Sequence, residues 1–215
     1  GSASLNPHYV VHPLEGIKSN LDDNIQVSYA KGCHTYKFLP AIPTELFKEN
    51  DGFKVDFFDG QEFEGEPIET KILKGNKFWA MGGFGLDIVA QSKRPSLSVR
   101  FAGEIEPEFT GEYEFEIFSI GPSRLSINGE NLIDNWTSQD PGDAFFGMGS
   151  SPKRNTVTFQ KGESYFIEVE YKWEGRFPAV QIGMQVPDQH DLMEEAISLA
   201  GQSDAVILIV GTNSD

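Results

Sequence analysis

Short runs in which apolar and polar residues alternate recur through the middle of the chain, and they constrain the fold more than any other feature. Residues 163–173 are the clearest case, because Ile167, Val169 and Tyr171 alternate there with charged residues. Side chains of a strand point alternately to its two faces, so such a run predicts a strand with one face in water. Similar runs cover residues 53–57, 97–101, 113–117 and 180–186.

Turn signals separate these runs. Asn128-Gly129 lies between two apolar segments, and this pair accepts the positive φ angles of a tight hairpin turn. Seven or more short strands, punctuated by Pro and Gly, favour a mainly β fold, an antiparallel β-sandwich or barrel. We assign it to residues 49–187.

The two ends of the chain, residues 1–48 and 188–215, follow a different pattern. Residues 192–200 carry apolar side chains at helical spacing, and Ala205–Val210 is a wholly apolar run typical of a strand in a parallel sheet covered on both faces. With a strand at Ile25–Ala30, they would form a right-handed crossover unit of a partial α/β domain, into which the β domain is inserted. The alternative is that the ends are disordered or decorate the β domain. A two-strand fragment is unstable alone, so we expect the chain to be part of a larger protein.

Composition narrows the classes of ligand. The 33 acidic and 17 basic residues give a net charge of −16, which disfavours nucleic acid and anionic membranes. Cys33 is the single cysteine and the four histidines show no metal-binding spacing, so we expect no metal and no other cofactor. The run at residues 205–210 is too short to span a bilayer, and the compartment, cytoplasmic or secreted, stays open.

One loop carries an unusual pair of rings. Residues 141–150, PGDAFFGMGS, have turn composition, yet Phe145 and Phe146 stand together within them. Loops run over the surface, so a ring there either anchors the loop in the core or is held out for a ligand. We expect one anchor and one exposed ring, without being able to assign them.

Three motifs in this part of the chain, LIDNW (132–136), PGDAFFGMGS and FQKGESYFIEVEY (159–171), resemble the PA-fourteen, or protective-antigen type, domain. In the terminal strips, PLEGIK (13–18), VSYAKGC (27–33) and LIVGTNSD (208–215) resemble the α/β sandwich domain of glycoside hydrolase family 3 β-glucosidases. Some members of that family carry the β module as an insertion.

The resemblance implies a fragment of a retaining β-glucosidase that acts on β-glucosides or short gluco-oligosaccharides. Its nucleophilic Asp would lie in a barrel domain and its acid/base beyond the α/β strips, so neither is present. Ser214-Asp215 imitates the nucleophile motif in the wrong context. We expect the fragment alone to be inactive, with the barrel and α/β domains of the parent enzyme as partners and a homo-oligomer possible.

In such enzymes the module leans over the active-site pocket and shapes the subsites beyond the cleaved sugar. The resemblance therefore implies substrate binding by Phe145 and Phe146, with Asp143 and Asp140 as acceptors for sugar hydroxyls. We expect Trp136 to pack beneath the same loop, and Asp134 or Asn135 to cap turn amides.

Two other functions stay open. One is a stand-alone lectin-like module; the flocculin relatives bind sugar through calcium held by two aspartates, but this chain has Ile120, Gly121 and Pro122 at that place. The other is an architectural insertion that mediates contacts between subunits.

Overall fold

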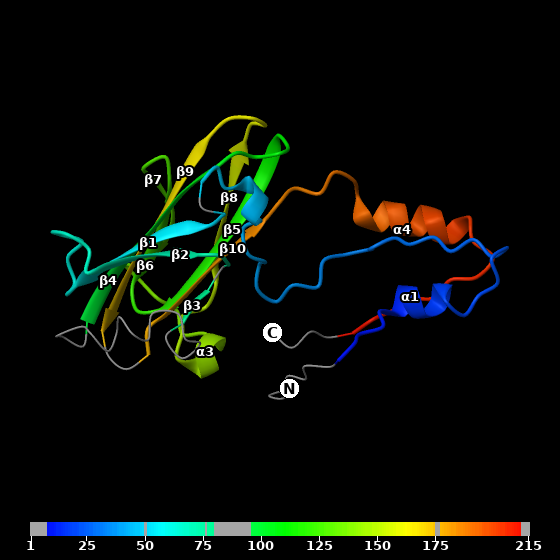
Figure 1. Ribbon diagram of the computed structural model, residues 1–215, viewed down its shortest axis with the longest axis horizontal. Coiled ribbons are helices and arrows are strands. Elements are labelled where there is room, and N and C mark those ends of the chain that lie inside the picture. Colours follow the sequence, from blue (N-terminus) through cyan, green and yellow to red (C-terminus); the bar gives the residue numbers. More distant parts are fainter. Residues whose placement is uncertain (1–7, 50, 76, 80–95, 175–176, 212–215) are drawn as a thin grey trace. The chain divides into compact units, whose positions relative to one another are not determined.

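The computed structural model describes residues 8–49, 51–75, 77–79, 96–174 and 177–211 (Figure 1). The chain divides into a unit formed by Phe38–Pro187, here called the β unit, and a second unit formed by the two ends, Gly1–Lys37 and Asp188–Asp215. The β unit begins before the expected residue 49. Its first residues, which follow no alternating pattern, bury Leu39, Ile42 and the short 3-10 helix η1 (Thr44–Leu46) with Leu46.

The β unit is a sandwich of two antiparallel sheets, as the alternating runs predicted. In the described residues the larger sheet has six strands in the order β2-β1-β4-β9-β6-β7. Their bounds are β1 (Phe53–Asp59), β2 (Glu69–Leu73), β4 (Ser96–Ile105), β6 (Ser123–Ile127), β7 (Glu130–Asn135) and β9 (Tyr165–Glu174). The smaller sheet has the order β3-β10-β5-β8, with β3 (Lys77–Trp79), β5 (Gly111–Ile120), β8 (Lys153–Phe159) and β10 (Ala179–Gln185).

The predicted hairpin joins β6 to β7. Asn128 and Gly129 have φ angles of 51° and 82°, the left-handed conformation that the tight turn requires. The Asn128 side-chain oxygen also accepts a hydrogen bond of 2.8 Å from the Phe166 amide of β9. Both the turn and its neighbouring strand are therefore fixed by this one residue.

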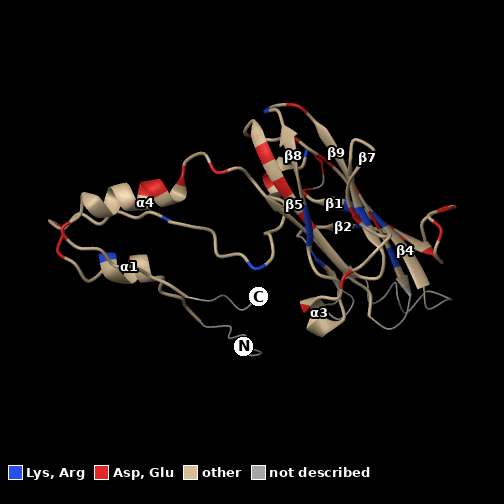
Figure 2. Ribbon diagram, turned by 180° about the vertical axis from the view of Figure 1, so that it is seen from behind, with Lys and Arg blue, Asp and Glu red and all other residues tan. Residues whose placement is uncertain are grey.

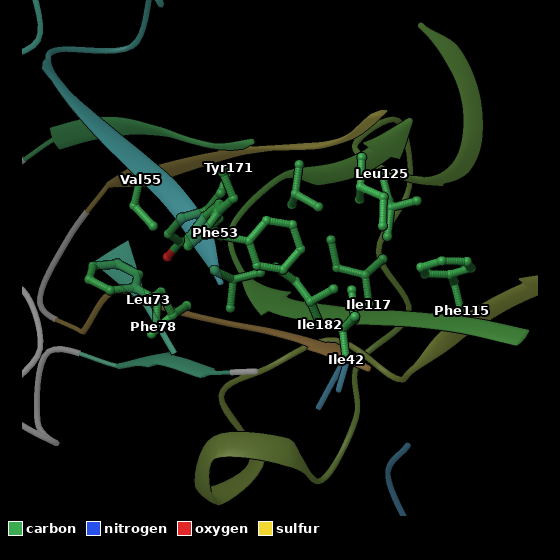
Figure 3. Close-up of a cluster of buried hydrophobic side chains, with 14 of the residues drawn as sticks. Ile42, Phe53, Val55, Leu73, Phe78, Phe115, Ile117, Leu125, Tyr171 and Ile182 are labelled. Carbon is green, nitrogen blue, oxygen red and sulfur yellow. The ribbon is translucent and has the colours of Figure 1, made fainter. Parts of the chain in front are cut away.

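The core fills the space between the two sheets (Figure 3). On β5, Tyr113, Phe115 and Ile117 point inward and are fully buried, while glutamates between them form the red bands of Figure 2. The alternation of the sequence thus becomes the inside and outside of the sandwich. The remaining inward side chains include Phe53, Val55, Phe78, Phe101, Leu125, Val169 and Ile182.

Tyr171 links the two sheets through its hydroxyl group. It comes from β9 of the larger sheet, donates a hydrogen bond of 2.7 Å to the Ile120 carbonyl, and accepts one of 2.9 Å from the Ala179 amide. Both partners belong to the smaller sheet. Complete burial raises the pKa of the Tyr171 hydroxyl, which therefore stays protonated and keeps donating.

The second unit contains α1 (Pro13–Lys18) and α4 (Leu192–Gly201). The helix predicted at residues 192–200 is confirmed, and the Asp191 side chain caps it by accepting hydrogen bonds from the Met193 and Glu194 amides. The two expected strands, 25–30 and 205–210, are absent from this described part of the chain. A strand needs a hydrogen-bonding neighbour, and neither segment has one there.

The helices in the described residues are all too short or too polar to cross a membrane.

Candidate functional site

The loop with the two phenylalanines contains a left-handed turn. In the segment α3 (Ala144–Gly147), Phe145 and Phe146 have φ angles of 52° and 60°, and Gly147 has 78°. An aromatic residue in this conformation costs roughly 1 kcal/mol or more, and only the glycine adopts it readily. The chain therefore holds two strained residues in succession, which is typical of a functional segment.

Backbone hydrogen bonds close the base of this loop. The Gly142 amide donates to the Gly149 carbonyl at 2.9 Å, and the Ser151 amide donates to the Asp140 carbonyl at 2.7 Å. The Ser150 amide donates to Ser119 of β5 at 2.9 Å. The loop is thus a compact structure tied to the outer face of the smaller sheet.

The two rings have opposite environments. Phe145 is 7% exposed and packs on Phe118 of β5, with ring centroids 5.4 Å apart, beside Ala179 of β10. Phe146 is 81% exposed. One ring therefore anchors the loop and the other is presented to solvent. The two successive left-handed residues point the neighbouring rings in different directions.

A pocket of about 150 Å³ lies beside the turn. Phe145 and Phe146 line it from the loop, Phe38 lines it from the start of the β unit, and Phe118 and Gln181 line it from the sheet. Lys77 also contributes, with its Nζ 5.9 Å from the centroid of the Phe145 ring. The walls are mainly aromatic, with few polar groups, which is the usual character of a ligand pocket.

The two aspartates predicted as hydroxyl acceptors lie on the same loop but are not among the described residues that line the pocket. Both are exposed. Asp143 precedes the left-handed turn, and its carbonyl accepts the Gly147 amide at 3.2 Å. Their backbone groups stabilise the loop; sugar binding by their carboxylates remains a prediction.

A buried polar cluster supports the loop from below. Asn135 is fully buried, and its Nδ2 lies 3.0 to 3.1 Å from the hydroxyl oxygens of Ser119, Ser123 and Ser150, which share its two N–H donors. These four residues join β5, β6 and β7 to the end of the loop. Asn135 therefore positions the loop rather than capping a turn.

Asp134 is one of the two residues expected to cap turn amides, and it caps the turn after β7. Its carboxylate accepts hydrogen bonds from the Thr137 amide and hydroxyl and from the Trp136 amide. These bonds, those of Thr137 first, lower the pKa of Asp134 from 3.8 to about 2. The carboxylate is thus ionised at neutral pH.

The expectation that Trp136 packs beneath the phenylalanine loop is wrong. Its ring lies over the outer face of the larger sheet, 5.0 Å from the Arg124 guanidinium and 5.2 Å from the Lys172 Nζ. Arg124 and Lys172 point outward from β6 and β9, and cations attract the electron-rich face of the indole. Phe145 belongs to the opposite outer face.

A larger hollow of about 540 Å³ lies among the loops at residues 45–48, 106–109 and 161–162. Its charges are mixed, and the buried polar atoms that lack a partner in the described part of the chain do not line it. The described part of the chain also contains no group of His, Cys, Asp and Glu side chains arranged to hold a metal ion. The pocket beside Phe146 is therefore the stronger candidate, although it is smaller.

Sequence reasoning missed Phe38 and Gln181. Phe38 comes from a segment without periodicity, and Gln181 occupies a polar position in an alternating strand, which indicates a side chain in water. Ser214 and Asp215 lie outside the described residues.

Comparison with known proteins agrees with the motifs. The model of the PA14 domain family matches residues 87–190. A β-glucosidase of Rhizobium radiobacter is 30% identical over the whole chain, and β-glucosidase B of Emericella nidulans is 28% identical. The chain spans 26% of the length of each.

A solved structure gives the same result for the fold. The crystal structure of a β-glucosidase from Kluyveromyces marxianus superposes with a TM-score of 0.73 at 26% identity, covering 95% of this chain and 25% of that one. The same enzyme has been solved in complex with glucose. The PA14 domain model thus matches much of the β unit, and the chain is similar along its whole length to a segment of β-glucosidases, in agreement with the motifs.

Proposed function

We propose that this chain is the PA14-bearing segment of a retaining β-glucosidase, and that its β unit shapes the subsite for the leaving-group sugar. The observation that carries the proposal is the exposed ring of Phe146, held out by a strained turn at the rim of an aromatic pocket. The relatives named as β-glucosidases support the class of reaction, and the glucose complex of the Kluyveromyces marxianus enzyme supports the class of sugar.

The second unit supports a position within a larger protein. Val206–Val210 are apolar and 60–81% exposed in the described structure, a patch that a folded protein covers. The relatives are about four times longer than this chain. The apolar strip is the strand expected to join the sheet of the parent α/β domain, where it would find its hydrogen-bonding partners.

The chemistry of a sugar suits the ring. The C–H groups on one face of a glucose ring form an apolar surface that stacks on an aromatic side chain, while its hydroxyls need polar partners. The backbone strain of the turn fits this function, because the strained conformation keeps Phe146 away from the core. The bond-breaking carboxylates would come from the rest of the parent, so the isolated chain should be inactive.

The test is Phe146→Ala in the full-length protein. We expect the ratio of kcat/KM on a β-linked glucose disaccharide to that on a small aryl glucoside to fall by about three- to tenfold, the value of one stacking contact. Phe166→Ala is the matched control, because Phe166 is an exposed ring on β9, 44% exposed, outside the pocket. It should leave the ratio unchanged.

An unchanged ratio in Phe146→Ala would count against the proposal. Binding of gluco-oligosaccharides by the isolated chain, as tight as by the full-length protein, would instead favour an independent sugar-binding module. Hydrolysis of an aryl glucoside by the isolated chain would contradict the expectation that it is inactive.

A further inference from the structure

Gln181 lies at the floor of the pocket, on β10 in the middle of the smaller sheet. Its strand neighbours Val180 and Ile182 point into the core, so Gln181 points to the outer face. Its Cα pairs with that of Phe118 on β5 and that of Lys77 on β3.

Two segments cover this outer face on either side of Gln181. Leu39 packs directly on Gly183, where a Cβ would lie 2.7 Å from the Leu39 Cβ. The Leu39 amide is held by a hydrogen bond of 2.9 Å to the buried Glu116 carboxylate. On the other side, Phe145 covers Phe118. Gln181 is left between the two covers, where the pocket opens.

The amide oxygen of Gln181 has no hydrogen-bond partner among the described residues, although the residue is only 5% exposed. A buried polar group without a partner is costly, and in native proteins it usually marks a site for water or a ligand. The pocket, of about 150 Å³, is open to solvent on one side, so the hydroxyl-bearing edge of a sugar can reach this oxygen.

We propose that Gln181 is a specificity-determining residue of the leaving-group subsite, whose Oε1 accepts a hydrogen bond from one hydroxyl of the sugar stacked on Phe146. This inference rests on the function proposed above. Apart from one lysine, the surrounding walls are mainly the rings of Phe38, Phe118 and Phe145, and the amide is the polar group at the floor that reads the hydroxyl. An amide turned by 180° would donate to the same hydroxyl's oxygen, so the assignment holds for either orientation.

The test compares Gln181→Met with Gln185→Met in the full-length protein. Gln185 lies on the same strand and face but does not line the pocket, which makes it the matched control. The substrates are a β-linked glucose disaccharide, its analogues that each lack one hydroxyl of the leaving sugar, and an aryl glucoside. The readout is kcat/KM on each disaccharide relative to the aryl glucoside.

We expect Gln181→Met to lower this ratio by about three- to tenfold, the worth of one neutral hydrogen bond. The unsubstituted protein should show the same loss with one deoxy analogue, and Gln181→Met should lose nothing further with that analogue. Gln185→Met should behave like the unsubstituted protein. Since Met removes an oxygen that has no partner among the described residues, the melting temperature of Gln181→Met should be equal or higher, which excludes misfolding as the cause.

Two results would overturn the inference. One is an unchanged ratio in Gln181→Met. The other is a further loss in Gln181→Met with every deoxy analogue, so that the effects of the substitution and of the missing hydroxyl add. Failure of this inference differs from failure of the proposed function. If Phe146→Ala lowers the ratio and Gln181→Met does not, only the role of Gln181 is lost. If neither substitution has an effect, the leaving-group subsite is not in this pocket and both proposals fall.

Discussion

The two outer faces of the β-sandwich are completed in different ways. On the larger sheet, Glu170 accepts hydrogen bonds from both Arg100 and Arg124, and Trp136 covers the cations of Arg124 and Lys172. On the smaller sheet, chain segments form the cover, and they leave an aromatic pocket with Gln181 at its floor, whose amide oxygen has no partner in the described part of the chain. The first face is closed by charged pairs and an aromatic ring, whereas the second keeps an open pocket, which we propose as the sugar subsite.

This contrast predicts the largest effect for the ring that anchors the second face. Phe145→Ala would remove a buried ring from its contact with Phe118 and Ala179, and we expect the free energy of unfolding to fall by about 3 kcal/mol. Urea unfolding of the β unit measures it. Phe145→Leu keeps most of the apolar volume and should lose less than half as much; equal losses would mean that the anchor is not a packing contact.

The second largest effect is expected at the Tyr171 hydroxyl, which links the two sheets. Tyr171→Phe would leave the Ala179 amide and the Ile120 carbonyl without their buried partner, and we expect a loss of about 2 kcal/mol. Tyr165, whose hydroxyl lies in an exposed hydrogen bond to Glu163, supplies the control Tyr165→Phe. The two variants should differ clearly in urea midpoint, and a similar midpoint would refute the link.

Substitutions on the first face, that of the larger sheet, should lower the stability of the protein without changing its substrate specificity. Trp136→Ala would remove the ring over Arg124 and Lys172, with an expected loss of about 1 kcal/mol. The ratio of disaccharide to aryl glucoside activity should stay the same in the full-length protein. A changed ratio would show that the contrast between the faces is false.

Phe146→Gly should change substrate specificity with little effect on stability. Glycine adopts the φ of 60° without strain but loses more chain entropy on folding, so the unfolding free energy should change by about 0.5 kcal/mol or less. The substrate ratio should nevertheless fall as in Phe146→Ala. A large loss of stability would indicate that the exposed ring is part of the packing.

The smallest effect is a pH dependence at the edge of the first face. Since the pKa of Asp134 is lowered below 3.8 by the Thr137 and Trp136 hydrogen bonds, its ionised form stabilises the folded protein. That contribution is complete above pH 3.8 and is lost as the pH falls through about 2. In acid titrations of stability, Asp134→Asn should show a shallower decline over this range, and an identical curve would contradict the capping role.

The sequence identified those parts of the fold that local patterns determine. Period-two alternation located the strands, Asn128-Gly129 located the hairpin, and Asp191 with its helical spacing located α4. The apolar runs at residues 25–30 and 205–210 have strand composition, but a strand exists only when a neighbour supplies its hydrogen bonds. Composition alone does not provide that neighbour.

The site was predictable only in part, for a related reason. The rings of Phe145 and Phe146 were identifiable because aromatic residues are unusual in a Gly- and Asp-rich turn. Which ring points inward depends on two positive φ angles that side chains of this type rarely adopt. Gln181 was hidden because the pocket above it is formed by Phe38 and the phenylalanine loop, both distant from it in sequence.

The most direct test of the proposed subsite is a structure of the full-length protein with a β-linked glucose disaccharide or its product bound. We predict that the Phe146 ring lies against the apolar face of the leaving-group sugar, within about 4 Å as expected for apolar contact. A bound sugar that leaves this ring in solvent, or a ring packed against another subunit instead, would contradict it.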